Sequence, residues 1–219
     1  MPTTLPVLSL LETRVLGVLA EKQRTVPDTY PLTMNALLSG CNQKSSRDPV
    51  IETTESEVLA ALDSLNALSL IIESTGRVSH FAHNIERVLG IPTQSTALLA
   101  TLMLRGPQTA GQLRVNSERS HKFVDISSVE SFLVELSERP DGSLVVELPR
   151  QAGSRENRWM HLLSGEPVID AGVITSSMPA FNGSSREDEI SRLKICVAKL
   201  TEELSELRCK VDKLLAEQN

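Results

Sequence analysis

The sequence predicts a mainly α-helical fold with small β-hairpins, and three observations support this fold class. Apolar residues recur at helical spacing in several segments that begin at capping residues or end at breaker residues. Two pairs of short apolar segments flank polar turns, as expected for β-hairpins. The order of three helices and one hairpin then occurs twice along the chain. These elements, in this order, predict two tandem winged-helix (helix-turn-helix) domains.

The first predicted domain comprises residues 1–86. Ser9, followed three residues later by Glu12, forms a capping box at the start of an apolar helical pattern. Gly76 supplies the turn of the hairpin. The predicted elements are a helix over 9–23, a short helix over 32–38, a third helix that starts near Thr53 or Thr54, and hairpin strands over 70–73 and 78–82.

The second predicted domain comprises residues 87–165. Its predicted elements are a helix over 93–105, a short helix over 109–116, a third helix over 127–138, and hairpin strands over 144–148 and 158–162 with a polar tip at 151–157. Leu59 and Leu62 match Leu133 and Leu136 at an offset of 74 residues, which supports an internal repeat.

Two further segments follow the repeat. Residues 166–186 are rich in Gly, Ser and Pro and predict a flexible linker. Residues 187–219 predict a coiled-coil helix, because apolar residues alternate at steps of three and four. The heptad positions are Ile190, Leu193, Val197, Leu200, Leu204, Leu207, Val211 and Leu214. Mostly β-branched residues at one heptad position and Leu at the other favour a parallel two-stranded coil, so we expect a homodimer.

The net charge of −6 is unevenly distributed. Residues 1–86 hold 6 basic and 10 acidic side chains (−4), 87–165 hold 9 and 8 (+1), and 166–219 hold 7 and 10 (−3). No segment has the strongly basic composition of a non-specific nucleic-acid binder.

Composition also bears on location. No apolar segment approaches the length that crosses a bilayer, so we expect no membrane association. The first residues have neither a basic start nor an apolar stretch, and we therefore expect a cytoplasmic location. Cys41, Cys196 and Cys209 have no CxxC spacing, which predicts reduced thiols instead of disulfides or a zinc site.

The sequence offers no motif for catalysis. It contains no GxSxG nucleophile motif, no phosphate-binding P-loop and no dinucleotide fingerprint. His80 and His83 are three residues apart on a predicted strand, and therefore on opposite faces, which argues against a shared metal ion. We expect a non-enzyme without a cofactor or a metal.

Several sequence motifs resemble the bacterial YceH-like family over about residues 8–165. They are 10–17 (LLETRVLG), 30–37 (YPLTMNAL), 41–50 (CNQKSSRDPV), 104–109 (LRGPQT), 111–114 (GQLR), 148–150 (LPR) and 155–162 (RENRWMHL). The resemblance implies tandem winged-helix domains. The family has no established biochemical activity, so it implies no catalytic or binding residues.

The third helix of a winged-helix domain commonly enters the DNA major groove. Here both third helices are acidic, which disfavours this mode because phosphates would be repelled. The acidic residues are Glu55, Glu57 and Asp63 in the first, and Glu130, Glu135 and Glu138 in the second.

Basic residues outside the third helices are the alternative candidates for nucleic-acid contacts. Lys44 and Arg47 lie in a polar loop that could hold a phosphate or could be purely structural, with side chains that cap helix ends. The second group comprises Arg114, Arg119, Lys122, Arg150, Arg155 and Arg158 around the second helix-turn region and the second hairpin. These arginines could instead pair with Glu147 and Glu156 on an exposed hairpin.

Two hypotheses about function follow. The first is a dimeric, DNA-associated transcriptional regulator that binds double-stranded DNA through two half-sites. The alternative is a protein-interaction adaptor without direct DNA readout, which the net acidic charge and the acidic third helices favour. An enzyme is the third and weakest hypothesis, since no constellation of side chains suggests a reaction.

Overall fold

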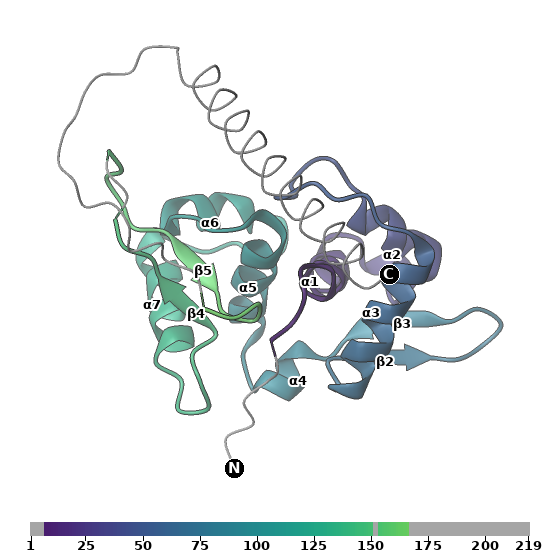
Figure 1. The fold of residues 1–219 in the computed structure, drawn as a ribbon. Coiled ribbons are helices and arrows are strands. Elements are labelled where there is room, and N and C mark those ends of the chain that lie inside the picture. The colour runs from purple at the N-terminus through teal and green to yellow at the C-terminus, as the bar shows by residue number, and fades with distance from the viewer. Residues whose placement is uncertain (1–6, 151–152, 167–219) are drawn as a thin grey trace, which may run out of the picture. The chain divides into compact units, whose positions relative to one another are not determined.

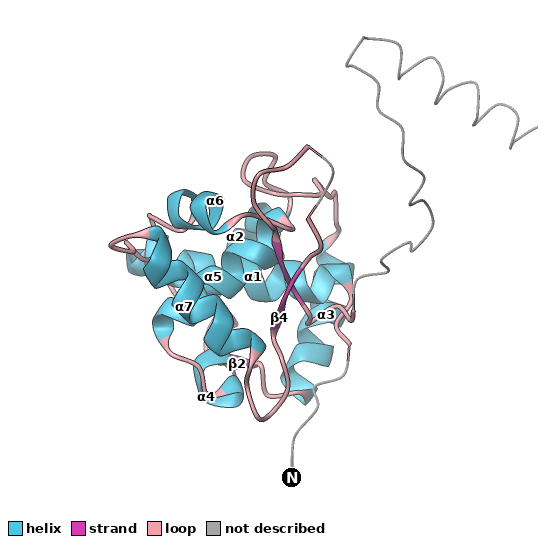
Figure 2. Ribbon diagram, turned by 90° about the vertical axis from the view of Figure 1, so that its left-hand side faces the viewer, coloured by secondary structure: helices cyan, strands magenta, loops and turns pink. Residues whose placement is uncertain are grey.

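The structure, a computed structural model, describes residues 7–150 and 153–166 (Figure 1). This part of the chain is mainly helical with two small antiparallel sheets, which confirms the predicted class at that level (Figure 2). The predicted linker, apart from Glu166, and the predicted coiled coil, with all eight heptad residues from Ile190 to Leu214, lie outside the described residues.

The first half contains three α-helices, one short 3-10 helix and a three-stranded sheet of order β1-β3-β2. Its elements are α1 (Leu10–Thr25), the 3-10 helix η1 (Pro27–Thr29), β1 (Leu32–Thr33), α2 (Met34–Cys41), α3 (Glu55–Ala67), β2 (Ile71–Ser74) and β3 (His80–His83). Leu32 and Thr33 were predicted to be helical, which is wrong: they pair with Phe81 and His80. Thr33 is the N-cap of α2, and its side chain accepts a hydrogen bond from the amide of Ala36.

Local capping fixes the helix starts that the sequence predicted. The Ser9 amide donates to Glu12 Oε2 (2.6 Å) and the Glu12 amide donates to Ser9 Oγ (3.2 Å) at the start of α1. Thr54 and Glu57 form the same capping box at the start of α3. Hydrogen bonds from Thr54 hold the pKa of the Glu57 carboxyl below its usual value. Both predicted helix starts are confirmed.

The second half repeats the order of elements after an additional short helix. Its elements are α4 (Ile85–Leu89), α5 (Thr93–Arg105), α6 (Ala110–Asn116), α7 (Ile126–Ser137), β4 (Val145–Glu147) and β5 (Trp159–His161). The sequence did not predict α4, which ends at Leu89 and is capped by Gly90 with a left-handed φ of 62°. Gln108 forms an isolated bridge with Trp159, in the place that β1 occupies in the first half.

Burial corrects the predicted register of the repeat. The fully or nearly fully buried positions are Val58, Leu62 and Leu65 in α3 and Val129, Leu133 and Leu136 in α7. These positions match at an offset of 71, so the predicted offset of 74 is wrong for the third helices; Leu59 is 49% exposed whereas Leu133 is fully buried. The offset of 74 holds for the following strands, from Ile71 to Val145. The segment between the last matched buried residue of the third helix and the following strand is therefore three residues longer in the second half.

The first helices of the two halves, α1 and α5, pack against each other (Figure 1). Gly17 allows a close approach, because a Cβ atom there would lie 3.0 Å from Leu104 Cγ and 3.2 Å from Met103 Cβ. Every residue from Ser95 to Leu104 is buried. The buried apolar residues of both halves form one continuous cluster.

Three further observations concern the described residues. Cys41 is a buried free thiol, and burial raises its pKa to about 12. No described helix combines the length and the apolar character that crossing a membrane requires. Among the same residues no cluster of three or more His, Cys, Asp or Glu side chains could hold a metal ion.

His161 on β5 predicts a pH-dependent stability. The residue is 8% exposed, Nδ1 has no hydrogen-bond partner among the described residues, and burial lowers the pKa to about 4 from 6.5. Below pH 6.5 the unfolded chain binds a proton that the folded protein excludes until about pH 4. The free energy of unfolding is therefore expected to fall across this interval, by on the order of 2–3 kcal/mol.

Urea unfolding between pH 7 and pH 4 checks this expectation. His161→Leu should flatten the decline. Burial also lowers the pKa of His83, so part of the decline remains in the leucine variant. An equally steep decline in wild type and His161→Leu would contradict the assignment.

Candidate nucleic-acid interface

Three of the predicted basic residues lie in or next to the connection between α6 and α7. Arg114, Arg119 and Lys122 are all exposed. Arg114 donates from Nη2 to the carbonyl oxygen of Val124 (3.1 Å), which holds the guanidinium beside the start of α7. Asp125 is the N-cap of α7 and accepts a hydrogen bond from the Ser128 amide (2.7 Å). Of these three cations, Arg114 is the one that its hydrogen bond places next to the first turn of α7.

The β4–β5 hairpin carries the second group, Arg150, Arg155 and Arg158, all exposed. Arg150 Nε donates to the carbonyl oxygen of Ser154 (2.7 Å). Glu147, one suggested partner of these arginines, instead accepts a hydrogen bond from Asn157 (3.0 Å). Among the described residues no carboxylate lies within 4.0 Å of a hairpin guanidinium nitrogen, so pairing with Glu147 or Glu156 is not observed.

Two of the three hairpin arginines adjoin the N-terminal part of α7. Arg150 and Arg155 line one cavity of about 350 Å³ together with Ile126 and Glu130 of α7, and Glu147 and Glu156 of the hairpin line the same cavity. Basic side chains therefore flank the start of α7 from two sides, the preceding connection and the following hairpin. The first turn itself, from Ile126 to Val129, bears no charged side chain.

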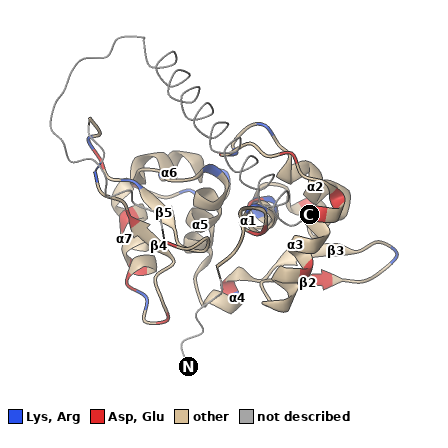
Figure 3. Ribbon diagram, in the orientation of Figure 1, with Lys and Arg blue, Asp and Glu red and all other residues tan. Residues whose placement is uncertain are grey.

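The bodies of the third helices carry acidic residues, which on α7 appear as red bands in Figure 3. The exposed carboxylates are Glu130 and Glu135 on α7, Glu138 just after it, and Glu55, Glu57 and Asp63 on α3. Insertion of either helix along its length into a groove would bring these carboxylates close to phosphates.

Lys44 and Arg47 have different surroundings. Lys44 is exposed, but the Arg47 side chain is 0% exposed and forms a bidentate ion pair with Glu21, with Nη2 to Oε2 at 2.6 Å and Nη1 to Oε1 at 3.2 Å. Its Nε also donates to the carbonyl oxygen of Gly40 (3.3 Å). Arg47 therefore stabilises the loop, in line with the structural alternative, and is not part of the exposed basic surface.

A second buried arginine, Arg14, was not predicted. Arg14 is fully buried in α1 and donates to the carbonyl oxygens of Cys41 (3.2 Å) and Pro49 (2.5 Å). Burial, together with the charge of Arg47, lowers the pKa of Arg14. Its burial could have been predicted from the apolar helical pattern, because that pattern places Arg14 next to Val15 on a buried face.

These features define a mainly helical protein with small antiparallel sheets and two repeated halves. The chain belongs to a family described as "Protein of unknown function, DUF480", whose model matches residues 8–154. This confirms the resemblance to an uncharacterised bacterial family.

The chain is similar to a "UPF0502 protein" of Dechloromonas aromatica, with 61% identity over 209 residues that cover 95% of this chain and 96% of the relative. A relative of Burkholderia ambifaria with the same designation is 54% identical over 217 residues, covering 93% of this chain and 92% of the relative. Neither the family description nor these names state an enzymatic activity.

Proposed function

We propose that the protein is a cytoplasmic, non-enzymatic winged-helix protein that associates with double-stranded DNA as a homodimer and acts as a transcriptional regulator. The order of elements supports a winged-helix assignment for both halves. In the second half, α5, α6 and α7 are followed by the β4–β5 hairpin, and Gln108 takes the place of the first strand.

The observation that carries the proposal is the set of exposed basic side chains on both sides of the start of α7. They have no carboxylate within 4.0 Å among the described residues. Arginines without an ion-pair partner keep their charge available to phosphates, and loops that flank a helix can follow the DNA backbone. We infer backbone contacts from the connection and the hairpin, with only the uncharged first turn of α7 near the bases.

Changing Arg150, Arg155 and Arg158 together to alanine is expected to weaken duplex binding by roughly tenfold or more. The logarithmic dependence of affinity on salt concentration should fall by about 0.9 for each phosphate that the variant no longer neutralises. Fluorescence anisotropy of the full-length protein with a labelled duplex, at low and at physiological salt, measures both quantities.

A matched control removes three cations that lie outside the hairpin and the α6–α7 connection, through Arg24→Ala, Arg77→Ala and Arg87→Ala. This variant has the same net charge as the hairpin variant, so a specific interface predicts little loss of binding. If wild type shows no salt-sensitive binding to any duplex at low salt, or if both variants lose affinity equally, the proposal is wrong.

The second candidate function is a protein-interaction adaptor. One observation favours it: Val115, Val124 and Ile126 are 68%, 84% and 44% exposed around the α6–α7 connection, next to the acidic face of α7. Exposed apolar side chains beside charged ones occur at protein interfaces. Affinity capture that returns a specific protein partner, which Val124→Asp no longer binds, would favour this candidate if duplex binding is absent.

The dimer rests on the heptad pattern of residues 190–214 alone. We expect sedimentation equilibrium to give twice the mass of the 23.9 kDa chain. Leu200→Pro together with Leu207→Pro should yield monomers, because proline interrupts a helix. A monomeric wild type would remove the homodimer from the proposal.

A further inference from the structure

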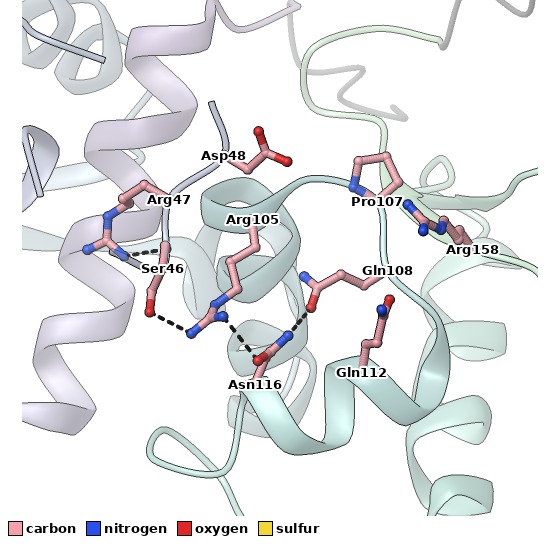
Figure 4. Close-up of a pocket in the computed structure, with 9 residues that line it drawn as sticks. All are labelled: Ser46, Arg47, Asp48, Arg105, Pro107, Gln108, Gln112, Asn116 and Arg158. Atoms are coloured by element: carbon pink, nitrogen blue, oxygen red, sulfur yellow. Dashed lines mark hydrogen bonds between the residues drawn. The ribbon is translucent and has the colours of Figure 1, made fainter. Parts of the chain in front are cut away.

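A polar pocket of about 340 Å³ lies between the two halves (Figure 4). One wall is the loop that follows α2, with Ser46 and Asp48. The other walls come from the second half, with Arg105 at the end of α5, Gln112 on α6 and Arg158 on β4–β5. The pocket opens broadly to solvent, and it shares Arg158 with the proposed DNA contact.

Positive charge exceeds negative charge around this pocket. Glu21 is already engaged by two nitrogens of Arg47. Arg105 binds only neutral acceptors, Ser46 Oγ (2.7 Å) from Nη2 and Asn116 Oδ1 (3.0 Å) from Nη1. Burial lowers the pKa of Arg105. The charge of Glu21 raises this pKa, and the charge of Arg47 lowers it. An anion in the pocket would compensate this partly desolvated guanidinium.

Arg158 supplies a second guanidinium at the rim. The close-up shows it beside Pro107, across the pocket from Asp48. Among the described residues its side chain has no hydrogen-bond or ion-pair partner. Its donors are therefore available to a ligand.

Side-chain amides line part of the pocket and form hydrogen bonds with their neighbours. Asn116 donates from Nδ2 to Gln108 Oε1 (2.5 Å), and Gln108 donates from Nε2 to the carbonyl oxygen of Gly106 (3.4 Å). Gln112 accepts the amide hydrogen bond of Thr109 (3.1 Å) through Oε1, so its Nε2 remains a donor. Asp48 is exposed and its carboxylate can accept a hydrogen bond from a ligand hydroxyl.

We propose that this pocket binds the phosphate group of a small organic phosphate. Arg158, Arg105 and the Gln112 amide donate to the phosphate oxygens, and Asp48 accepts from a hydroxyl group of the same ligand. Guanidinium forks match phosphate geometry, and the volume falls within the usual range of about 300–1,000 Å³ for small-molecule sites. Because both halves line the pocket, the ligand would contact the first and the second half together.

Gln112→Glu is the decisive variant. Glutamate keeps the carbonyl-type acceptor that completes the capping box with Thr109, so helix α6 is retained. It replaces the donor Nε2 with a negative oxygen, which repels a phosphate. Gln94→Glu makes the same charge change in the first turn of α5, away from the residues that line the pocket.

Isothermal titration calorimetry of the full-length protein, without DNA, uses ribose 5-phosphate as the probe and ribose as the uncharged control. We expect saturable binding of ribose 5-phosphate, roughly tenfold or more tighter than ribose, and a loss of roughly tenfold in Gln112→Glu but not in Gln94→Glu. Inorganic phosphate should compete with the probe.

Two results would overturn the proposal. The first is no saturable binding of ribose 5-phosphate at millimolar concentration, or equal binding by wild type and Gln112→Glu. The second is equal binding of ribose 5-phosphate and ribose, which would mean that the pocket does not recognise the phosphate group. The assay contains no DNA, so its outcome does not depend on whether the DNA proposal holds.

Discussion

Glu21→Ala is expected to lower the free energy of unfolding by about 3 kcal/mol. Glu21 is the only carboxylate within 4.0 Å of Arg47 among the described residues, and the Arg47 side chain is 0% exposed. Removing the acid leaves a buried charge without compensation, which costs more than the pair itself contributes. Urea unfolding followed by circular dichroism measures the loss.

Two comparisons separate this effect from a general loss of a surface charge. Arg24→Ala breaks an ion pair with Glu86 whose side chains are about 40% exposed, and should change stability by only about 0–1 kcal/mol. The double variant Glu21→Leu with Arg47→Met removes both charges and should recover much of the stability. A Glu21→Ala loss no larger than that of Arg24→Ala would contradict the inferred burial of Arg47.

Gly17→Val is expected to destabilise the protein by about 3 kcal/mol. A side chain at this position meets Leu104 at 3.0 Å and Met103 at 3.2 Å, so α1 and α5 must separate or repack. Gly76→Val is the matched control, since its Cβ meets only a carbonyl oxygen, at 3.8 Å, in an exposed hairpin turn.

A double-mutant cycle makes this prediction specific to the packing between the two helices. Leu104→Ala removes the atoms nearest to Gly17 and alone should cost about 2–5 kcal/mol. In the double variant with Gly17→Val, the loss of unfolding free energy should be about 1 kcal/mol smaller than the sum of the two single losses. Strict additivity would mean that the two side chains do not meet.

The sequence predicted those elements whose signals are local. The helix α5 has the predicted bounds of 93–105, and the capping pairs located the starts of α1 and α3. The strand β1 and the helix α4 were missed because each is very short. The pairing of Leu32 with Phe81 spans 49 residues, and no local pattern specifies such a pairing.

The candidate interface was predictable in part. The positions of basic residues relative to the predicted elements pointed to the hairpin and the α6–α7 connection, and their arginines are exposed as surface positions normally are. Arg47 differs because its partner Glu21 lies on another element, 26 residues earlier in the chain. Spacing along a sequence cannot reveal an ion pair that forms only when a loop folds back on a helix.

The packing of the buried helix α5 on α1 matters during synthesis, because α5 is made after the first half. The first half leaves the ribosome with the Gly17 side of α1 uncovered, and it stays uncovered until residues 93–105 have emerged and folded against it. Nascent chains grow at about 5–20 residues per second, so this apolar surface is exposed for seconds. A chain that stops before α5 would carry it permanently and is expected to require a chaperone or to aggregate.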